Sequence, residues 1–320
     1  MIFNRRQYFL LAFACLSLLM TVLLWIYPSQ VEIKQVVYLR PLSEIPIVKN
    51  VQAIDQHWQE LDLSATAVYA IDLKSASLLY EKNAEMKLYP ASTVKMMTAL
   101  VAVQDYELSE IVTVASGSAT IGHQADLQYG EQLTVEKILQ ALLVYSANDA
   151  AYVLANHHAN GFAAFINEMN LMGEGLKLKQ SYFVNPAGLD DAKQLTSARD
   201  LSVIARELLK NPFLRNLVAQ PYVDIQSLNQ NSLGQSLWRH QLYSSNQLLG
   251  KLNGVKGVKT GTTQAAGQVL VTLIERNGQE ILISLMNSQD RYGDTEKLIA
   301  WIFNNYQFAD LSQTWQVTSF

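Results

Sequence analysis

The chain has 320 residues, 49% of them hydrophobic and 16% charged, so it can bury one sizeable core. Its formal net charge of −4 argues against a nucleic-acid partner, which would require a basic face, so we expect none. The single cysteine, Cys15, excludes an internal disulfide and a thiolate metal site.

The first element is a charge-free stretch at residues 8–27, preceded by Arg5 and Arg6. Twenty helical residues at about 1.5 Å each span the roughly 30 Å hydrocarbon layer of a membrane. A cleaved signal peptide has a shorter apolar region and a small-residue cleavage site, which residues 28–30 do not offer. The pattern therefore favours an uncleaved membrane anchor over a signal peptide. The basic pair predicts that the N-terminus stays in the cytoplasm and that the rest lies outside.

Residues 64–82 are typical of a β-hairpin, because strand-like runs at 67–71 and 78–80 flank the turn-prone segment 74–77. Over the next hundred residues and more, the apolar periodicity is that of helices.

Three helices can be delimited in this middle region. Thr134 caps a run with a continuous apolar face, and a second apolar stripe, at 162–169, stops at Gly173. Residues 197–200 form a capping box that opens a third helix, which Asn211-Pro212 ends.

Strands return near the end of the chain. Residues 268–275 and 280–285 flank Asn277-Gly278, a hairpin signal because both positions tolerate positive φ. A last helix is expected from about 295 to 306. Strands thus bracket a helical middle, which predicts an α+β fold. We expect an antiparallel sheet flanked by helices, with an inserted, mainly helical lobe.

Ser92 and Lys95 lie at the start of a predicted helix, where residues three apart share a face. A serine hydroxyl needs an adjacent base, and a neutral lysine serves if burial or a helix N-terminus lowers its pKa. The same N-terminus offers a free backbone N–H to an oxyanion. Ser-x-x-Lys arises about once by chance in such a length, however, and a helix cap followed by a solvated lysine explains it more simply.

Lys259-Thr260-Gly261 precedes the apolar strand that starts at Gln268. A strand edge there could present Lys259 and Thr260 to a substrate carboxylate, and Gly261 would let a backbone come close. The alternative is a glycine-rich turn with exposed lysines.

Ser146-Ala147-Asn148 interrupts two apolar helical segments. Polar groups at such a break need a reason, and a proton-shuttling hydroxyl with a substrate-binding amide is one. Helix–helix capping explains the motif equally well.

In this order the three motifs resemble the signature of the penicillin-binding proteins and serine β-lactamases. The resemblance is greatest to the low-molecular-weight D-alanyl-D-alanine carboxypeptidases, serine peptidases of the β-lactamase/DD-peptidase superfamily, and covers about residues 60–309. A class A β-lactamase would need a deacylating glutamate whose usual setting segment 185–191 lacks. The stretches that carry the resemblance are Tyr89–Ala99, Ser146–Ala150, Asn185–Asp190, Thr196–Asp200 and Gly257–Gly261.

The resemblance, together with the apolar run at 8–27, implies a division of the chain into four parts. Residues 1–30 are the membrane anchor (or signal peptide), 31–58 a spacer, 59–309 the DD-peptidase catalytic domain and 310–320 a short tail. It also implies that the β-rich second domain and C-terminal amphipathic anchor of many relatives are missing.

The likeness implies an activity, the removal of the terminal D-alanine from peptidoglycan stem pentapeptides through an acyl-serine intermediate. Ser92 would be the nucleophile, Lys95 its proton acceptor, and Ser146 a relay of the proton towards the leaving D-alanine. β-Lactam antibiotics would be covalent inhibitors. The alternatives are a DD-endopeptidase or β-lactamase of the same fold, or a non-catalytic wall-binding protein.

The likeness also implies substrate-binding roles. Asn148 would bind the acyl amide, while Lys259, Thr260 and the close-approaching Gly261 would receive the terminal carboxylate. The backbone N–H groups of the nucleophile and of Thr262 would form the oxyanion hole, although many relatives carry a bulkier residue at the latter position. Arg199 is a secondary candidate for the carboxylate, although its place in a capping box favours a structural role.

We expect no cofactor and no metal, because no histidine belongs to a metal-spaced cluster or lies near the three motifs. The expected location is the cell membrane, with a single pass through residues 8–27 and the catalytic domain on the extracytoplasmic side, or secretion if the segment is cleaved. The histidines are His57, His123, His157, His158 and His240.

Overall fold

The structure is a computed structural model that describes residues 51–53, 61–116 and 121–308. Across these three ranges, we find no helix both long and apolar enough to cross a membrane.

The chain divides into two units, residues 1–45 and 46–320, and only the second contains described residues. The anchor predicted at 8–27 and the tail predicted at 310–320 lie outside the described residues, as does most of the 31–58 spacer.

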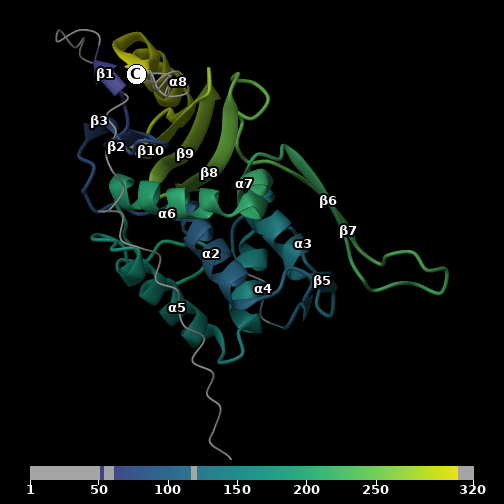
Figure 1. The fold of residues 1–320 in the computed structure, drawn as a ribbon. Helices are drawn as coiled ribbons and strands as arrows, with labels where there is room; N and C mark the ends of the chain where they lie inside the picture. The colour runs from purple at the N-terminus through teal and green to yellow at the C-terminus, as the bar shows by residue number, and fades with distance from the viewer. Residues whose placement is uncertain (1–50, 54–60, 117–120, 309–320) are drawn as a thin grey trace, which may run out of the picture. The chain divides into compact units, whose positions relative to one another are not determined.

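A five-stranded antiparallel sheet forms the centre of the second unit, and both predicted hairpins belong to it (Figure 1). Asn277 and Gly278 adopt the positive φ that their turn requires, 50° and 74°. Pairing of Ala67 with Met286 brings the two ends of the domain together. The strand order is β3 (Leu78–Lys82), β2 (Ala67–Asp72), β10 (Gln279–Ser288), β9 (Gly267–Arg276) and β8 (Val255–Thr263).

Helices cover both faces of this sheet (Figure 1). Successive residues of β10 alternate between the two sides: Leu282 joins the core under the helical lobe, and Ile283 joins the core under α8. The predicted α+β architecture is confirmed. The helical elements are η2 (Ala91–Val94), α2 (Lys95–Asp105), α3 (Val135–Gln140), η3 (Ala141–Tyr145), α4 (Asn148–His157), α5 (Phe162–Gly175), α6 (Ala198–Lys210), α7 (Pro212–Val218) and α8 (Arg291–Asn305).

The predicted helix caps are confirmed, and one start differs. The hydroxyls of Thr134 and Ser197 accept from the backbone N–H three residues later, at 3.4 and 3.1 Å. α8 begins before the predicted residue 295, because Asp290 caps it by accepting from the N–H of Gly293 at 3.0 Å. Arg291 therefore lies in the first turn of α8.

The middle region also contains strands that the sequence did not predict. β4 (Ile111–Thr113) pairs with β5 (Gln132–Thr134), and β6 (Tyr222–Gln226) pairs with β7 (Arg239–Tyr243). Runs of three to five residues are too short for alternation to stand out beside helical periodicity. β1 (Val51–Ala53) pairs with β11 (Tyr306–Phe308).

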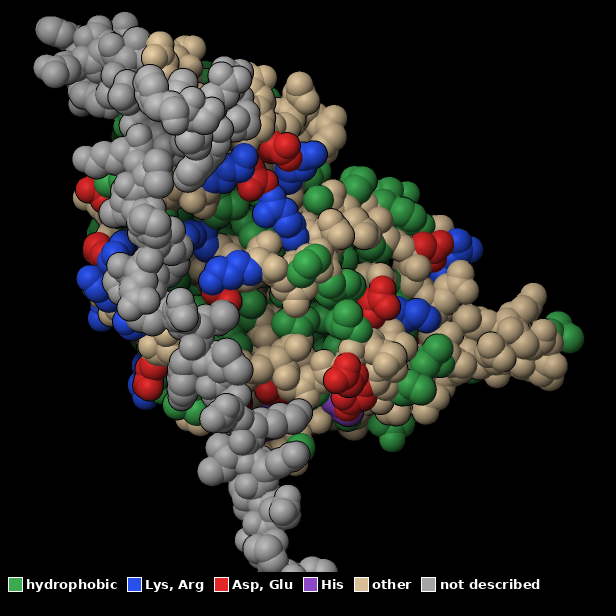
Figure 2. Space-filling model, in the orientation of Figure 1, with side chains coloured by type: hydrophobic (Ala, Val, Ile, Leu, Met, Phe, Trp, Pro, Cys, Tyr) green, Lys and Arg blue, Asp and Glu red, His purple; other side chains and the backbone are tan. Residues whose placement is uncertain are grey.

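The connection between β6 and β7 projects from the helical lobe (Figure 1). Residues 226–238 carry no charged side chain, and Figure 2 shows the projecting end almost wholly in tan and green. Leu233 at this end is 80% exposed.

Candidate active site

Ser92 and Lys95 lie where the short 3₁₀ turn η2 passes into helix α2. Side chains three apart are nearly eclipsed in a 3₁₀ turn, and the Lys95 amine lies 2.8 Å from the Ser92 hydroxyl oxygen. The same Nζ donates to Asn148 Oδ1 at 2.6 Å and to the carbonyl oxygen of Ala187 at 2.8 Å. The lysine is fully buried, so the alternative of a solvated lysine is wrong.

The surroundings of Lys95 favour its neutral form. Burial lowers its pKa well below the ordinary value, and the charge of Lys259 lowers it further, against an opposing effect of Asp149. A neutral amine has two N–H donors and one lone pair. With the donors directed at Asn148 and Ala187, the lone pair is free to accept the hydroxyl proton of Ser92.

Ser146 lies at the break between η3 and α4 that the sequence predicted. The last turn before Ser146 is wide, because the N–H of Ser146 donates to the carbonyl of Ala141, five residues back. Ser146 itself has a φ of 73°. This left-handed residue ends the turn, and α4 starts afresh at Asn148. The Ser146 hydroxyl accepts a hydrogen bond of 2.7 Å from Lys259 Nζ.

The amide of Asn148 is held on two sides. Its Oδ1 faces Lys95, while its Nδ2 donates to the carbonyl of Ile121 at 2.7 Å. The backbone N–H of Asn148 donates to the carbonyl of His123, also at 2.7 Å. The ring of His123 stacks on Tyr145 with centroids 4.0 Å apart. The prediction that no histidine lies near the motifs is therefore wrong for His123, which tertiary folding brings there.

Strand β8 carries Lys259, Thr260 and Gly261 at one edge of the sheet, so the alternative of a turn with exposed lysines is wrong. Lys259 is only 1% exposed, and burial together with the charge of Arg291 lowers its pKa to about 7. A Cβ on Gly261 would lie 2.9 Å from the backbone nitrogen of Ser92. Glycine therefore allows the strand to run directly against the turn that carries Ser92.

The loop at 185–190 closes the cluster from a third side. Besides the Ala187 carbonyl, it supplies Gly188, where a Cβ would lie 1.9 Å from the carbonyl oxygen of Ala91. Its Asp190 accepts from the hydroxyl of Thr263, at the end of β8, at 2.6 Å. The loop thus contacts both the serine turn and the lysine strand.

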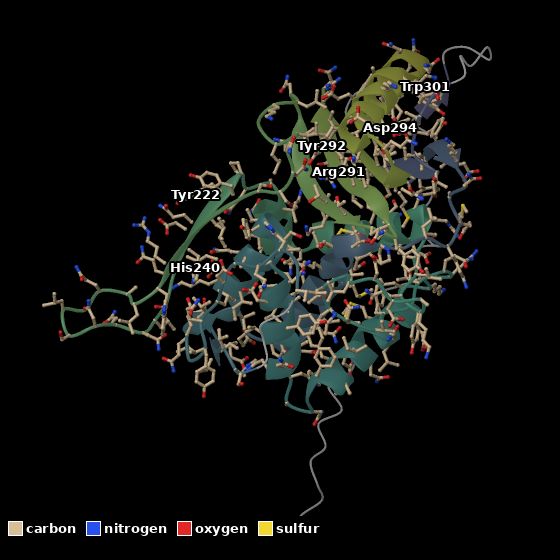
Figure 3. All side chains as sticks on the ribbon, turned by 180° about the vertical axis from the view of Figure 1, so that it is seen from behind. Tyr222, His240, Arg291, Tyr292, Asp294 and Trp301 are labelled. Atoms are coloured by element: carbon tan, nitrogen blue, oxygen red, sulfur yellow. The ribbon has the colours of Figure 1, made fainter. Side chains whose placement is uncertain are left out.

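One arginine agrees with expectation, and a second arginine near the site was not predicted. Arg199 lies in the first turn of α6 and pairs with Glu85 at 2.6 Å, which is the structural role that its capping box favoured. Arg291 was missed; its Nη1 donates to the carbonyl of Gly261 at 2.9 Å and to Thr262 Oγ1 at 2.7 Å. Figure 3 shows it at the start of α8, beside Tyr292. The N-cap Asp290 is the signal that could have placed it at a helix start.

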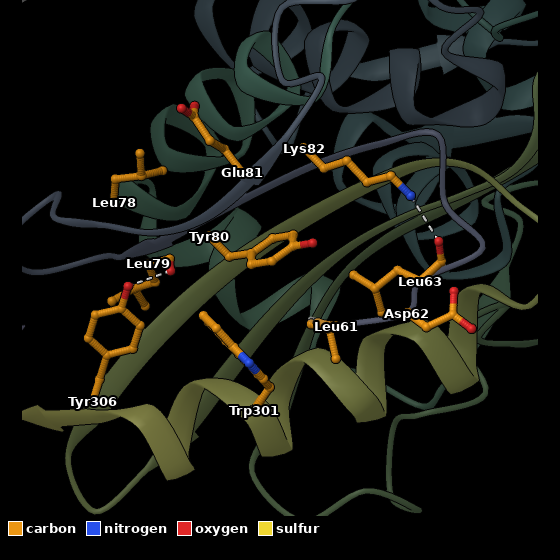
Figure 4. Close-up of a pocket in the computed structure, with 10 residues that line it drawn as sticks. All are labelled: Leu61, Asp62, Leu63, Leu78, Leu79, Tyr80, Glu81, Lys82, Trp301 and Tyr306. Carbon is orange, nitrogen blue, oxygen red and sulfur yellow. Dashed lines mark hydrogen bonds between the residues drawn. The ribbon is translucent and has the colours of Figure 1, made fainter. Parts of the chain in front are cut away.

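A pocket of about 1010 Å³ lies elsewhere, between β3, the segment before β2 and the end of α8 (Figure 4). Tyr80 and Trp301 contact edge to face within it, and Lys82 donates to the carbonyl of Leu63. Its lining contains none of the residues of the cluster. The lining residues are Leu61, Asp62, Leu63, Leu78, Leu79, Tyr80, Glu81, Lys82, Trp301 and Tyr306.

The fold and the cluster together define a class. A serine hydroxyl against a buried lysine, beside a Ser-x-Asn turn and a Lys-Thr-Gly strand edge, is the arrangement of the active-serine, penicillin-interacting enzymes. Residues 52–290 match the peptidase S11 family, described as D-alanyl-D-alanine carboxypeptidase, over well more than half of the chain. The chain belongs to this family.

Individual relatives agree with this assignment. D-alanyl-D-alanine carboxypeptidase DacF of Bacillus subtilis is 28% identical over 257 residues, covering 78% of this chain and 64% of the relative. DacB2 of Mycobacterium tuberculosis is 30% identical over 218 residues, covering 67% of this chain and 72% of the relative. The chain thus spans less than two thirds of the length of DacF.

Solved structures share the fold. The crystal structure of the Streptomyces K15 DD-transpeptidase superposes with a TM-score of 0.72 at 27% identity, covering 77% of this chain and 99% of that one. The predicted β-lactamase/DD-peptidase-like fold is confirmed.

Proposed function

We propose that this chain is a serine-type D-Ala-D-Ala carboxypeptidase that removes the terminal D-alanine from peptidoglycan stem pentapeptides. The observation that carries the proposal is the hydrogen-bonded contact of Ser92 with a buried Lys95, 2.8 Å apart. Membership of the peptidase S11 family and the names of its relatives support the same reaction.

Acylation begins when the Lys95 amine takes the hydroxyl proton of Ser92. The serine oxygen attacks the carbonyl carbon of the penultimate D-alanine, and the backbone N–H groups of Ser92 and Thr262 stabilise the oxyanion. The peptide C–N bond then breaks. Ser146, hydrogen-bonded to Lys259, passes its proton to the departing amine of D-alanine and takes up the proton that Lys95 accepted, so the Lys95 amine is neutral again.

Deacylation completes the cycle. A water oxygen attacks the ester carbonyl as one of its protons passes to the Lys95 amine. The bond to Ser92 then breaks, and the serine oxygen takes that proton from Lys95. The products are a tetrapeptide and free D-alanine.

Substrate binding uses the polar groups around the serine. Asn148 has one Nδ2 hydrogen engaged with Ile121, and its other hydrogen donates to the acyl amide of the peptide. Lys259 and Thr260 bind the terminal carboxylate, and Arg291 adds positive charge at the same strand edge. Arg199 takes no part in this proposal.

The proposed function also implies where the protein is located and what inhibits it. Residues 8–27 anchor the chain in the membrane with the catalytic domain on the extracytoplasmic side, and cleavage of that segment would release it. β-Lactams acylate Ser92 and inhibit the enzyme covalently. Both the membrane location and the covalent inhibition are tested by fractionating cells and labelling each fraction with a fluorescent penicillin.

Ser92→Ala tests the reaction itself. We expect the full-length variant to lose D-alanine release from a peptide ending in D-Ala-D-Ala by at least about a thousandfold, because among the described residues only the Ser92 hydroxyl contacts the Lys95 amine. Ser232→Ala, an exposed serine on the projecting loop, is the matched control and should keep the wild-type rate.

The same assays separate the alternatives. Release at the wild-type rate from Ser92→Ala would refute the assignment. Cleavage of cross-linked muropeptides would indicate an endopeptidase, and turnover of penicillin a β-lactamase. Transfer to an added amino acceptor would indicate a transpeptidase, and absence of penicillin labelling a wall-binding protein.

A further inference from the structure

The link between β7 and β8 carries Ser244-Ser245-Asn246, a Ser-x-Asn sequence outside the cluster described above. Ser245 contacts three elements through three different groups. Its N–H donates to the carbonyl of Val144 at 3.1 Å, and its carbonyl accepts from the Tyr292 hydroxyl at 3.2 Å. Its hydroxyl lies 2.6 Å from that of Thr260.

Each of these three elements holds one part of the active site. Val144 belongs to η3, which ends directly before Ser146. Thr260 follows Lys259 in β8, and Tyr292 follows Arg291 at the start of α8 (Figure 3). Ser245 is therefore hydrogen-bonded to the turn that ends at Ser146, to the strand that carries Lys259, and to the start of the helix that carries Arg291.

The contact with Thr260 also orients a hydroxyl. Each hydroxyl has one hydrogen to donate and lone pairs to accept, so one of the two must donate across the 2.6 Å contact. A carboxylate only accepts. When the Ser245 hydroxyl donates to Thr260, the hydrogen of Thr260 is left to donate to a carboxylate. Thr260 is 5% exposed, which leaves its hydroxyl few other orientations.

We propose that Ser245 is a positioning residue for the terminal carboxylate of the substrate, acting through the hydroxyl of Thr260. The inference rests on the proposed carboxypeptidase function and deepens it. Ser245 lies outside the three motifs, and we expect it to contribute to the enzyme's preference for a free C-terminal carboxylate over an uncharged C-terminus.

The test compares two substrates on one preparation of the full-length protein carrying Ser245→Ala. One peptide ends in D-Ala-D-Ala with a free carboxylate, and the other is its C-terminal amide. We expect kcat/KM on the acid to fall about tenfold, because a hydrogen bond to a charged group is lost, and kcat/KM on the amide to change less than about twofold. A fraction of unfolded protein lowers both rates equally, so the ratio reports only on recognition.

Two variants complete the design. Ser245→Thr keeps a hydroxyl and should restore the acid-to-amide ratio. Ser244→Ala removes a neighbouring hydroxyl that accepts from the N–H of Asn246 at 3.2 Å, and should keep the wild-type ratio.

An unchanged ratio in Ser245→Ala, in a wild type that releases D-alanine, overturns this assignment and leaves the proposed function standing. An equal fall in the acid-to-amide ratio of kcat/KM in Ser244→Ala and Ser245→Ala also overturns it. A wild type that releases no D-alanine overturns the proposed function and this assignment with it.

Discussion

Lys95 and Lys259 are both buried, yet the proposed mechanism needs them in opposite charge states. Lys95 must be neutral to accept a proton from Ser92, whereas Lys259 must be charged to attract a carboxylate. Burial lowers the pKa of both, and the charge of Lys259 further lowers the pKa of Lys95. The second lysine therefore binds substrate and also helps to keep the first one neutral.

This pairing predicts how acylation depends on pH. Lysine is charged below its pKa, so as pH rises through about 7 Lys259 loses its charge and the acylation rate should fall. Arginine stays charged throughout, so Lys259→Arg should lose this alkaline decline while acylating about tenfold more slowly overall. The measurement is the rate constant for acylation by a fluorescent penicillin from about pH 5 to about pH 10.

Lys256→Arg, an exposed lysine of the same strand, is the control and should keep the wild-type profile. An alkaline decline at the same pH in Lys259→Arg would assign it to another group.

At the scale of elements, one residue joins two helices. Asn211 ends α6 and caps α7, where its Oδ1 accepts from the N–H groups of Phe213 and Leu214 at 3.0 and 3.2 Å. α7 in turn packs on β8, since a Cβ on Gly257 would lie 2.7 Å from the carbonyl oxygen of Val218. The cap therefore supports the helix behind the lysine strand.

Asn211→Ala should lower the free energy of unfolding by about 1 kcal/mol, because two N–H groups at the start of α7 lose their acceptor. Denaturation in urea measures the change. The neighbouring Lys210→Ala removes only an exposed ion pair with Glu207 and should cost less than about 0.5 kcal/mol. Equal losses in the two variants would show that the cap contributes nothing of its own.

At the scale of the whole domain, Asp294 joins segments 230 residues apart. Its carboxylate accepts from the N–H and hydroxyl of Ser64 at 3.0 and 2.7 Å, and from the N–H of Ala65 at 2.9 Å. The Ser288 hydroxyl donates to it as well, at 2.7 Å. Burial alone would raise the pKa of Asp294, but these hydrogen bonds outweigh it and lower the pKa below its ordinary value.

A carboxyl whose pKa is lower in the folded state stabilises the fold above its unfolded value, about 3.9, and this contribution disappears as pH falls through the folded value. Asp294→Asn should therefore lower the free energy of unfolding by about 2 to 3 kcal/mol at neutral pH. The difference from wild type should shrink below about pH 4.

Urea denaturation at several pH values measures this dependence. Glu296→Gln, exposed on the same helix, should behave as wild type at every pH. A difference for Asp294→Asn that persists undiminished in acid would exclude the charge as its cause.

The sequence by itself determined the local features: both hairpins of the sheet, the caps at Thr134 and Ser197, and the three motifs in their order. Each depends on residues only a few positions apart, so periodicity, turn chemistry and capping are enough to predict it. The three motifs were also sufficient to identify the family.

Only the tertiary structure decided which distant groups meet. Lys95 is three residues from Ser92 but touches Asn148 and Ala187, and nothing local to Arg291 indicates that it lies against β8. The carbonyl of His123 that holds Asn148 is equally invisible in the sequence. These contacts arise because the sheet pairs the two ends of the domain, and the burial that lowers the pKa of both lysines exists only once the helical lobe has packed against that sheet.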